Sequence, residues 1–525
     1  MRDVQPHLGR VQVYPAPPGA EAGLAHSVRV DGTPVFVERY EDVSYARFAV
    51  RGPVTVEIEV AASVARHVVF PRERVGEPRV SGRVLSFELP APRSIVVWID
   101  DLEKLVLLPD PPEDDAVLPG ARGVFDVSVF GVDPGGAAVQ TAALQAVIDR
   151  AARHPGGGIV LVPAGGFRTG TLSLPSHVRL HIAAGALLAG SDDPGDYPLD
   201  PGRRESAGDE TLAPDARFLG RTMTFSRLLL VDLAEGVRIT GRGTIDGAGS
   251  VLRKVHGAAP NLLRVRSSRD VAVRDVLFRN SAAWSLHVLA SRDVTFDNVK
   301  LLNDRTNLNT DGIDPDMSTD VRIERCFVYT KDDAICVKAS GNGGLTGDPA
   351  RIVARGNLLS SVDAALKVGT ESAAATFSDI RFEDNHVFET GRAMSVVVRD
   401  GATYDGITFS GVDIGPGVEH LVEQVIGVRD PAADLGVVRN LVFKDVSAPS
   451  YGPPATNWTW YAQFRPSRPG PEERVKVFEG ADETHGVEGL TLRNVVVNGA
   501  HLRDAATAAD VAGLAIGEHV RNPSG

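Results

Sequence analysis

The feature that most constrains the fold is a short pattern, an aspartate followed by alternating apolar residues, that recurs along the chain. Val271 and Val294 in the first two copies are 23 residues apart, and Val294 and Val321 are 27 apart. A period this short leaves no room for a crossover helix between parallel strands, whereas it matches one coil of a solenoid. The sequence therefore predicts an all-β fold, a right-handed parallel β-helix. The copies are residues 270–273, 293–296, 320–323, 379–382, 406–409, 440–443 and 489–492, the last three beginning with Gly or Asn.

The first hundred residues follow another pattern, in which short runs alternate apolar and polar residues between turn signals. Alternation with period two is typical of strands that bury one face, and many such short runs favour a sandwich. We therefore expect an N-terminal antiparallel β-sandwich and linker over residues 1–115, with the charged, proline-containing linker at 110–115, and the β-helix over 116–525. The runs are residues 28–30, 35–37, 54–60 and 94–99.

One helix is predicted between the two regions, over residues 138–153. Its apolar residues recur at helical spacing, and a helix there would cover the open end of the solenoid and block edge-on pairing. The predicted apolar face comprises Val139, Ala143, Leu144, Val147, Ile148 and Ala151.

Composition excludes several classes of function. The chain of 525 residues has a net charge of −13 and no polybasic run, which argues against nucleic acid as a partner. No apolar run is long enough to span a bilayer, and the N-terminus lacks the apolar core of a signal peptide. We expect a cytoplasmic location, or a secreted one if a leader was removed. The two cysteines, Cys326 and Cys336, are expected to be buried free thiols.

Two acidic clusters flank the copy at 320–323, with Asp311 in the first cluster and Asp332 and Asp333 in the second. Asp311 and Asp332 are 21 residues apart, close to one coil, so their carboxylates can stack on adjacent rungs about 4.8 Å apart. Carboxylates this close cannot both ionise easily, so one should hold a proton near neutral pH. A protonated acid beside an ionised base is what glycosidic bond cleavage needs. Adjacent residues face opposite ways in a strand, so Asp332 and Asp333 can share a groove only if the backbone bends there.

Residues 309–314, Asn-Thr-Asp-Gly-Ile-Asp, and 332–335, Asp-Asp-Ala-Ile, resemble the first two active-site motifs of the polygalacturonase family of glycoside hydrolases. The dextranase and isopullulanase family of the same clan keeps a similar set of three aspartates, and some of its members carry an N-terminal β-sandwich. The resemblance implies that Asp332 is the general acid, that Asp311 and Asp333 activate water, and that the anomeric configuration inverts. It implies no cofactor and no metal.

Further candidates for substrate binding lie around these motifs. Asn309 begins the first motif, and Trp284 with His287 resembles the Ser-Pro-x-Trp-x-x-His segment of the family, with Ala at the Pro position. Arg305, Lys367 and Arg399 are cationic residues on or near the central coils, as is Lys338. The Gly-His-Gly and Arg-Ile-Lys motifs of polygalacturonases do not occur in the sequence, so whether a sugar carboxylate is bound stays open. Asp314 and Asp316 extend the acidic cluster, and a calcium loop is a competing interpretation for them.

The sequence thus predicts a glycoside hydrolase acting on an oligosaccharide or polysaccharide, polygalacturonase-like. The alternatives are a dextranase-like hydrolase of a neutral glycan, a polysaccharide lyase on the same fold, and a non-catalytic carbohydrate-binding protein. The sugar, the linkage and the oligomeric state stay open. Insertions near residues 195–222 and 450–486 would favour exo action if they closed one end of the groove.

Overall fold

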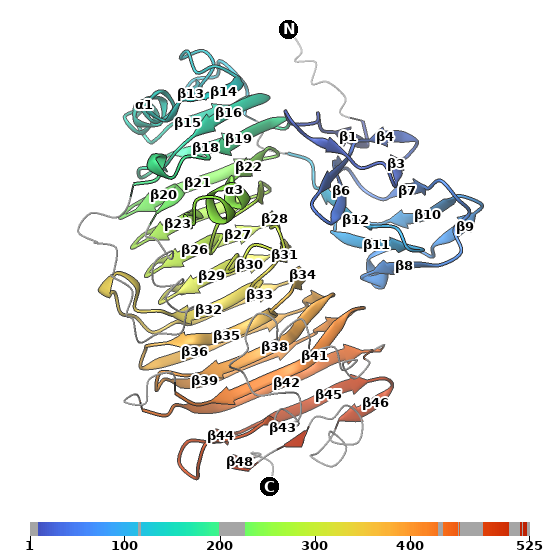
Figure 1. The fold of residues 1–525 in the computed structure, drawn as a ribbon, viewed down its shortest axis with the longest axis vertical. Helices are drawn as coiled ribbons and strands as arrows, with labels where there is room; N and C mark the ends of the chain where they lie inside the picture. Colours follow the sequence, from blue (N-terminus) through green and yellow to red (C-terminus); the bar gives the residue numbers. More distant parts are fainter. Residues whose placement is uncertain are drawn as a thin grey trace.

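The structure, a computed structural model, describes residues 9–113, 117–198, 226–428, 434–449, 451, 476–502, 515–516 and 518–521. From residue 124 on, parallel strands wind into one long solenoid, and the sheets of residues 11–110 lie beside its first half (Figure 1). The predicted parallel β-helix behind an N-terminal pair of sheets is confirmed.

The N-terminal region consists of two sheets that share an apolar core containing Val56, Phe87, Phe48 and Leu107. Nearly all neighbouring strands pair antiparallel, as predicted. The exception is the pair β6 and β12, in which Lys104 to Asp110 runs in the same direction as Val43 to Ala49. The first sheet contains β1 (Val11–Val13), β2 (Glu21–Ala22), β5 (Val37–Tyr40), β6 (Val43–Val50), β8 (His67–Phe70), β11 (Ile95–Ile99) and β12 (Lys104–Asp110). The second contains β3 (Ser27–Val30), β4 (Thr33–Val35), β7 (Val54–Glu59), β9 (Arg79–Ser81) and β10 (Val84–Leu89).

The predicted repeat corresponds to one ladder of the solenoid. Val271, Val294, Val321, Ile352 and Ile380 lie opposite one another in register from coil to coil. This ladder contains β21 (Glu235–Gly241), β24 (Arg269–Arg274), β27 (Arg292–Asp297), β30 (Thr319–Glu324), β33 (Ala350–Arg355), β36 (Thr376–Glu383), β39 (Thr403–Ser410), β42 (Val437–Ala448) and β45 (Thr491–Val497).

Two further ladders complete each coil. One contains β22 (Thr244–Asp246), β25 (Leu277–Arg279), β28 (Lys300–Leu302), β31 (Phe327–Thr330), β34 (Leu358–Ser361), β37 (His386–Val387) and β40 (Asp413–Ile414). The other is a separate sheet of β17 (Leu172–Ser173), β20 (Arg227–Asp232), β23 (Asn261–Arg266), β26 (Leu286–Leu289), β29 (Ile313–Asp316), β32 (Ile335–Ala339), β35 (Ala364–Ser372), β38 (Thr390–Val398) and β41 (Val418–Ile426).

The backbone conformation explains why the repeat begins with an aspartate. Asp270, Asp293, Asp320 and Asp379 have φ between 50° and 56°, in the left-handed region. Asp, Asn and Gly enter that region more easily than other residues, which explains why Gly and Asn replace Asp in later copies. The copy in β33 has Arg351 at this position, with φ 54°, and the sequence pattern missed it for that reason.

This backbone requirement predicts the effect of a substitution at Asp293, which is exposed and has φ 54°. Asp293→Ile should lower the free energy of unfolding by about 1–2 kcal/mol, because a β-branched residue is strained in the left-handed region. Asp293→Asn, which tolerates that conformation, is the matched control and should stay within about 0.5 kcal/mol of wild type. Urea unfolding of both variants checks this, and equal stability of the two would contradict it.

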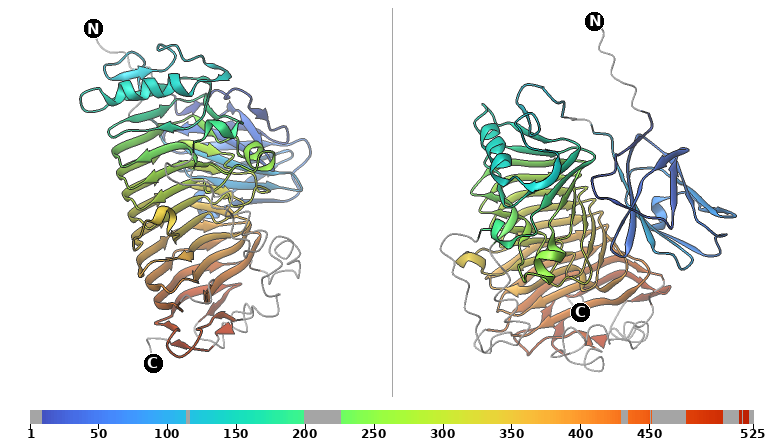
Figure 2. Two further views of the ribbon diagram at one scale, coloured as in Figure 1. Left: turned by 60° about the vertical axis from the view of Figure 1, so that its left-hand side comes forward. Right: turned by 45° about the horizontal axis from the view of Figure 1, so that its top comes forward.

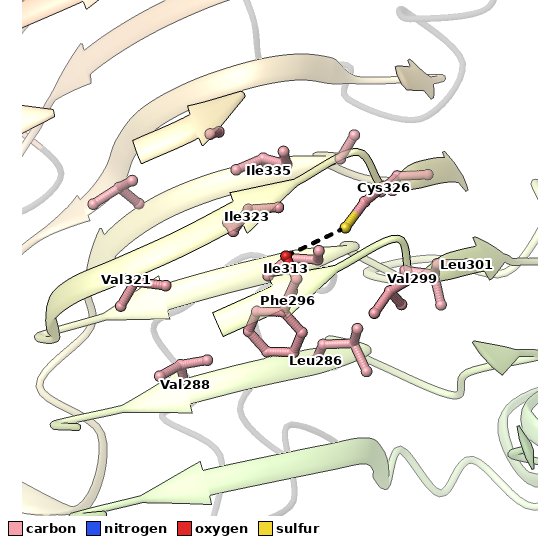
Figure 3. Close-up of a cluster of buried hydrophobic side chains, with 14 of the residues drawn as sticks. Leu286, Val288, Phe296, Val299, Leu301, Ile313, Val321, Ile323, Cys326 and Ile335 are labelled. Atoms are coloured by element: carbon pink, nitrogen blue, oxygen red, sulfur yellow. Dashed lines mark hydrogen bonds between the residues drawn. The ribbon is translucent and has the colours of Figure 1, made fainter. Parts of the chain in front are cut away.

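The interior of the solenoid is filled by apolar side chains stacked from coil to coil (Figure 3). The rings of Phe382, Phe409 and Phe443 follow one another with centroids 4.9 and 5.1 Å apart, which matches the spacing of parallel strands. Cys326 lies in this core, with its Sγ 3.8 Å from the carbonyl oxygen of Phe296. Cys326 and Cys336 are both buried free thiols, as predicted.

The predicted helix is present as α1 (Thr141–Ala152), and it covers the N-terminal end of the solenoid (Figure 2). Leu144, Val147, Ile148 and Ala151 are buried against the first coils, as expected. The prediction was wrong for Val139 and Ala143, which are exposed. Residues 135–139 form the strand β14 (Gly135–Val139), so the helix starts later than its apolar pattern suggested. The first coils also contain β13 (Val124–Asp126), β15 (Ile159–Val162), β16 (Gly165–Thr169), β18 (Arg179–Ile182) and β19 (Ala186–Gly190).

The N-terminal sheets pack on the solenoid through a second apolar contact, in which Tyr45 and Val106 meet Leu302, Phe327 and Tyr329. Asp110, the first residue of the expected charged linker, belongs to a strand instead. It ends β12 with its side chain fully buried, paired with Lys300 and with Arg242 at 3.1 Å. The chain from 111 to 113 has no regular structure, and the rest of the predicted linker, 114–116, lies outside the described residues. Within the described part of the chain, none of the helices has the length and apolar character needed to cross a membrane.

Candidate active site

The three aspartates of the two motifs converge. Asp311 precedes β29, and Asp332 and Asp333 lie between β31 and β32 one coil later. One carboxylate oxygen from each of the three lies within 4.8 Å of the others. The coils are joined directly, because the backbone N–H of Gly312 donates to the carbonyl of Asp333 at 2.8 Å. The predicted stacking of the motifs on adjacent rungs is therefore what the structure has.

A backbone bend lets the two adjacent aspartates share one side of the solenoid. Residues 331 and 332 are in a bend rather than a strand. The hydroxyls of Thr330 and Ser361 donate to the carbonyl of Asp332 at 2.6 and 2.7 Å, which holds the bend in place. At Gly312 an added Cβ would lie 2.3 Å from the carbonyl oxygen of Ala334, so the coils meet too closely there for any side chain.

Alternation along the strands places a polar face opposite the core. In β29 and β32, Ile313, Ile335 and Val337 point into the core, so Asp314 and Lys338 point to the other side. His287 is in register with Asp314, and Asp316 with Lys338. The polar face of this sheet is thus built from neighbouring coils around the aspartates.

Lys338 is the cation nearest to Asp311, with its Nζ 2.5 Å from Oδ2 of that carboxylate. It also lies 3.5 Å from Asp314, 3.8 Å from Glu371, and 4.0 Å from the ring centroid of Trp284. Burial alone would lower the pKa of Lys338, but Asp311 and Asp314 raise it well above its ordinary value, so the ammonium stays charged.

The buried position of Asp311 makes it a weak acid. Burial raises the pKa of Asp311 well above the ordinary carboxyl value, Lys338 opposes this, and Asp332, Asp314 and Asp333 add to it. Asp311 and Asp333 are both 2% exposed, whereas Asp332 is partly exposed. A raised pKa among close carboxyls agrees with the expectation that one proton is retained in this cluster.

Lys367 pairs with the second buried aspartate. Its Nζ lies 2.6 Å from Oδ2 of Asp333. On β35, Lys367 lies directly opposite Cys336 of β32. Two of the three aspartates therefore each have a buried lysine within ion-pair distance. This places Lys367 at the predicted site, in contact with a carboxylate of the protein.

His287 is fully buried and its Nε2 donates to Asp316 at 2.9 Å. Burial lowers the pKa of His287, and Asp316 opposes this, so the ring is neutral near pH 7 with its proton on the nitrogen that faces Asp316. Trp284 packs edge-on against His287, with ring centroids 5.0 Å apart, and is 5% exposed. Both predicted residues thus lie beside Lys338, which pairs with Asp311.

Arg253 is a neighbour of the site that the sequence did not indicate. It lies on α3 (Gly249–Lys254) and donates to Oδ1 of Asn309 at 3.0 Å. Burial lowers the pKa of Arg253 to about 10, and Asp332 opposes this shift. No spacing in the sequence connects Arg253 with Asp332, because α3 lies three coils earlier, between β22 and β23.

Of the other predicted cations, Arg305 has its hydrogen bonds away from the three aspartates. Arg305 donates to Ser360 and to the carbonyl of Glu389, and its guanidinium lies over the ring of Tyr329, where the N-terminal sheets pack. The backbone of Arg399, just after β38, hydrogen-bonds to Ser372. Their role in substrate binding stays a prediction. The predicted insertions near 195–222 and 450–486 lie largely outside the described residues.

The three aspartates also have the spacing of a cation site. Carboxylate oxygens are ligands for Ca²⁺ and Mg²⁺, but Lys338 and Lys367 already place positive charge on Asp311 and Asp333. The chemistry that the arrangement suits best is proton transfer, with a partly exposed carboxyl beside two buried, lysine-paired carboxylates.

The central region of the chain is similar in sequence to known proteins. Residues 220–414, which contain both aspartate motifs, match the family model described as glycosyl hydrolases family 28. The resemblance to the polygalacturonase family is confirmed. A probable polygalacturonase of Vitis vinifera is 30% identical to this chain over 269 residues, which are 49% of this chain and 53% of that protein. An exo-poly-alpha-D-galacturonosidase of Dickeya chrysanthemi is 25% identical over 268 residues, covering 40% of this chain and 41% of that protein.

The chain spans about half the length of these relatives. Among solved structures, Dex49A from Penicillium minioluteum superimposes with a TM-score of 0.50 at 11% identity, over 85% of this chain and 92% of that one. At that identity the similarity supports the fold alone. The family 28 match covers the coils that carry the three aspartates.

Proposed function

We propose that the protein is a glycoside hydrolase that cleaves a galacturonan or related glycan by an inverting mechanism. The observation that carries the proposal is the convergence of Asp311, Asp332 and Asp333 within 4.8 Å, inside the region that matches family 28. The names of the relatives, polygalacturonase and exo-poly-alpha-D-galacturonosidase, support galacturonan as the first substrate to test.

In the proposed reaction Asp332 protonates the leaving oxygen, because it is the partly exposed member of the three. Asp311 and Asp333 take a proton from the attacking water, and each is paired with a buried lysine. Lys338 opposes the rise in the pKa of Asp311 that burial causes. The separation of the carboxylates is shorter than the 6.5–9.5 Å usual for inverting enzymes, so it does not itself support inversion. Inversion rests on the family resemblance.

A product assay tests both the activity and the stereochemistry. Incubation with galacturonan oligosaccharides should release reducing sugar, and proton NMR of the first product should show the anomer opposite to that of the bond cleaved. Product of the same configuration would contradict inversion while leaving hydrolysis intact. Dextran and rhamnogalacturonan serve as parallel substrates, and turnover of dextran alone would favour the neutral-glycan alternative.

A lyase is the second candidate, because the three carboxylates have a spacing that can hold a cation. A β-helix lyase would leave an unsaturated product that absorbs in the ultraviolet, and a chelator would abolish the activity. Hydrolysis should give no such absorbance and should be unaffected by EDTA, so one assay on galacturonan separates the two reactions.

The lysine partner of Asp311 makes activity depend on pH in a predictable direction. Lys338→Met should raise the pKa of Asp311 further, because an opposite charge at 2.5 Å is lost. Since the base must be ionised, kcat/KM should fall most on the acid side, by about 10-fold or more at pH 5 and less at pH 8. Lys338→Arg, which keeps the charge, is the control. An equal loss at every pH would contradict this role.

A further inference from the structure

Asp314 is a buried carboxyl that the proposed reaction does not use. Its side chain is fully buried on β29, and neither of its oxygens has a hydrogen-bond partner. Buried polar groups are nearly always hydrogen-bonded, and a buried unpaired charge is costly. An ionised carboxylate in this position would therefore need strong compensation from a neighbouring cation.

The compensation for Asp314 comes from Lys338, which Asp311 shares. Lys338 is the cation that faces it, at 3.5 Å, and its hydrogen bond goes to Asp311 at 2.5 Å. The other groups that act on Asp314 are carboxylates from the coils packed against it. They are Asp316 on the same strand, Asp333 before β32, and Glu371 on β35.

Two further titratable neighbours of Asp314 are uncharged. His287 lies in register with Asp314 on β26, and burial keeps its imidazole neutral. Burial also raises the pKa of the Cys336 thiol on β32 well above its ordinary value, so this group stays neutral. A single lysine thus faces a set of carboxyls that cannot all be charged at once.

We propose that Asp314 is a positioning residue that holds a proton at neutral pH and so leaves the charge of Lys338 to Asp311. This rests on the proposed role of Asp311 as part of the base. When Asp314 is neutral, Lys338 binds Asp311 at hydrogen-bond distance and favours its ionised form. When Asp314 loses its proton, it competes for the same ammonium, and its negative charge raises the pKa of Asp311.

The protonation of Asp314 supports this order of events. Burial raises the pKa of Asp314 to about 8, Lys338 opposes the shift, and Asp333, Asp316 and Glu371 add to it. A group with this pKa is largely protonated at pH 6 and largely ionised at pH 10.

The first experiment measures the proton itself and needs no activity. Infrared difference spectra of the full chain carrying Asp332→Asn are recorded between pH 6 and pH 10 with and without the additional substitution Asp314→Asn. We expect the protonated-carboxyl absorbance at pH 6 to contain a component that disappears with a midpoint near pH 8 and is missing after Asp314→Asn. Any component from Asp311 is present in both spectra and cancels in their comparison. A spectrum at pH 6 that Asp314→Asn leaves unchanged would overturn the proposal, whatever the reaction of the enzyme.

The second experiment tests the coupling to Lys338. Asp314→Asn keeps a neutral side chain of the same shape at every pH, so the ratio of kcat at pH 9 to kcat at pH 6 should rise up to about 10-fold over wild type. KM should change less than kcat, because no contact with substrate is involved. Asp314→Ser, a smaller neutral side chain, should shift the ratio in the same direction if Asn does not fold. An unchanged ratio in the folded variants means that Asp314 has a structural role only and refutes the positioning role.

Discussion

Asp332→Asn should lower kcat on galacturonan by about 1,000-fold or more while the protein stays folded. General acid catalysis contributes about 10²–10⁴-fold, and an amide cannot protonate the leaving oxygen. Asp332 is partly exposed, and an Asn side chain can still accept the hydrogen bond that Oδ1 accepts from the backbone N–H of Asp333 at 3.0 Å. Circular dichroism and the thermal unfolding midpoint verify the fold, and the rate is measured as reducing sugar released. A rate near that of wild type would exclude Asp332 as the acid.

A substrate with an activated leaving group separates the acid from the base. The aryloxide of an activated aryl galacturonide departs without needing a proton. Asp332→Asn should therefore lose far less activity on this substrate than on the oligosaccharide. Asp311→Asn and Asp333→Asn should lose activity on both substrates, because the water still needs a base. The matched control is Asp320→Asn. Asp320 is partly exposed and pairs with Arg351 away from the site, and Asn can replace it at its left-handed φ. It should retain wild-type rates on both substrates.

Asp110→Asn should lower the free energy of unfolding by about 3–5 kcal/mol, the cost of breaking one side of a buried ion pair. Asp110 is fully buried and pairs with Lys300, which is also buried, and it accepts from Asn298 at 2.8 Å. Arg242 would keep Asp275 at 2.7 Å as an ion-pair partner. Most of the loss in stability therefore comes from Lys300, whose buried ammonium loses its carboxylate partner. Urea unfolding measures the change, and limited proteolysis shows whether the N-terminal sheets are released first.

The pH dependence of this penalty has a defined sign. Burial alone would raise the pKa of Asp110, but Lys300, Arg242 and Arg47 lower it below its ordinary value. The ion pair therefore stabilises the protein above about pH 4 and loses that effect as the pH falls through the lowered pKa. The difference between Asp110→Asn and wild type should shrink at low pH. Asp101→Asn, which breaks an exposed pair with Arg66 at 2.9 Å, should cost less than about 1 kcal/mol.

Periodic features were predictable from the sequence because they repeat at the spacing of the structure. The ladder of Val271, Val294 and Val321 follows from the alternation of apolar residues, and the proximity of Asp311 to Asp332 follows from a separation of about one coil. The start of α1 was placed too early, because an apolar residue at the end of β14 fits a helical pattern as well as a strand. Local patterns carry no information on where one element ends and the next begins.

The sequence by itself determined the solenoid and the place of the three aspartates within it, since both depend on spacing along one continuous chain. Only the tertiary structure decided which charges meet those aspartates. Lys338 pairs with both Asp311 and Asp314, and Arg253 on α3 contacts Asn309 at the site from an earlier coil. Asp110 became a buried contact with Lys300 rather than part of a linker. The reason is that burial and charge pairing depend on side chains brought together from distant segments, and these shift a carboxyl's pKa far more than its sequence neighbours do.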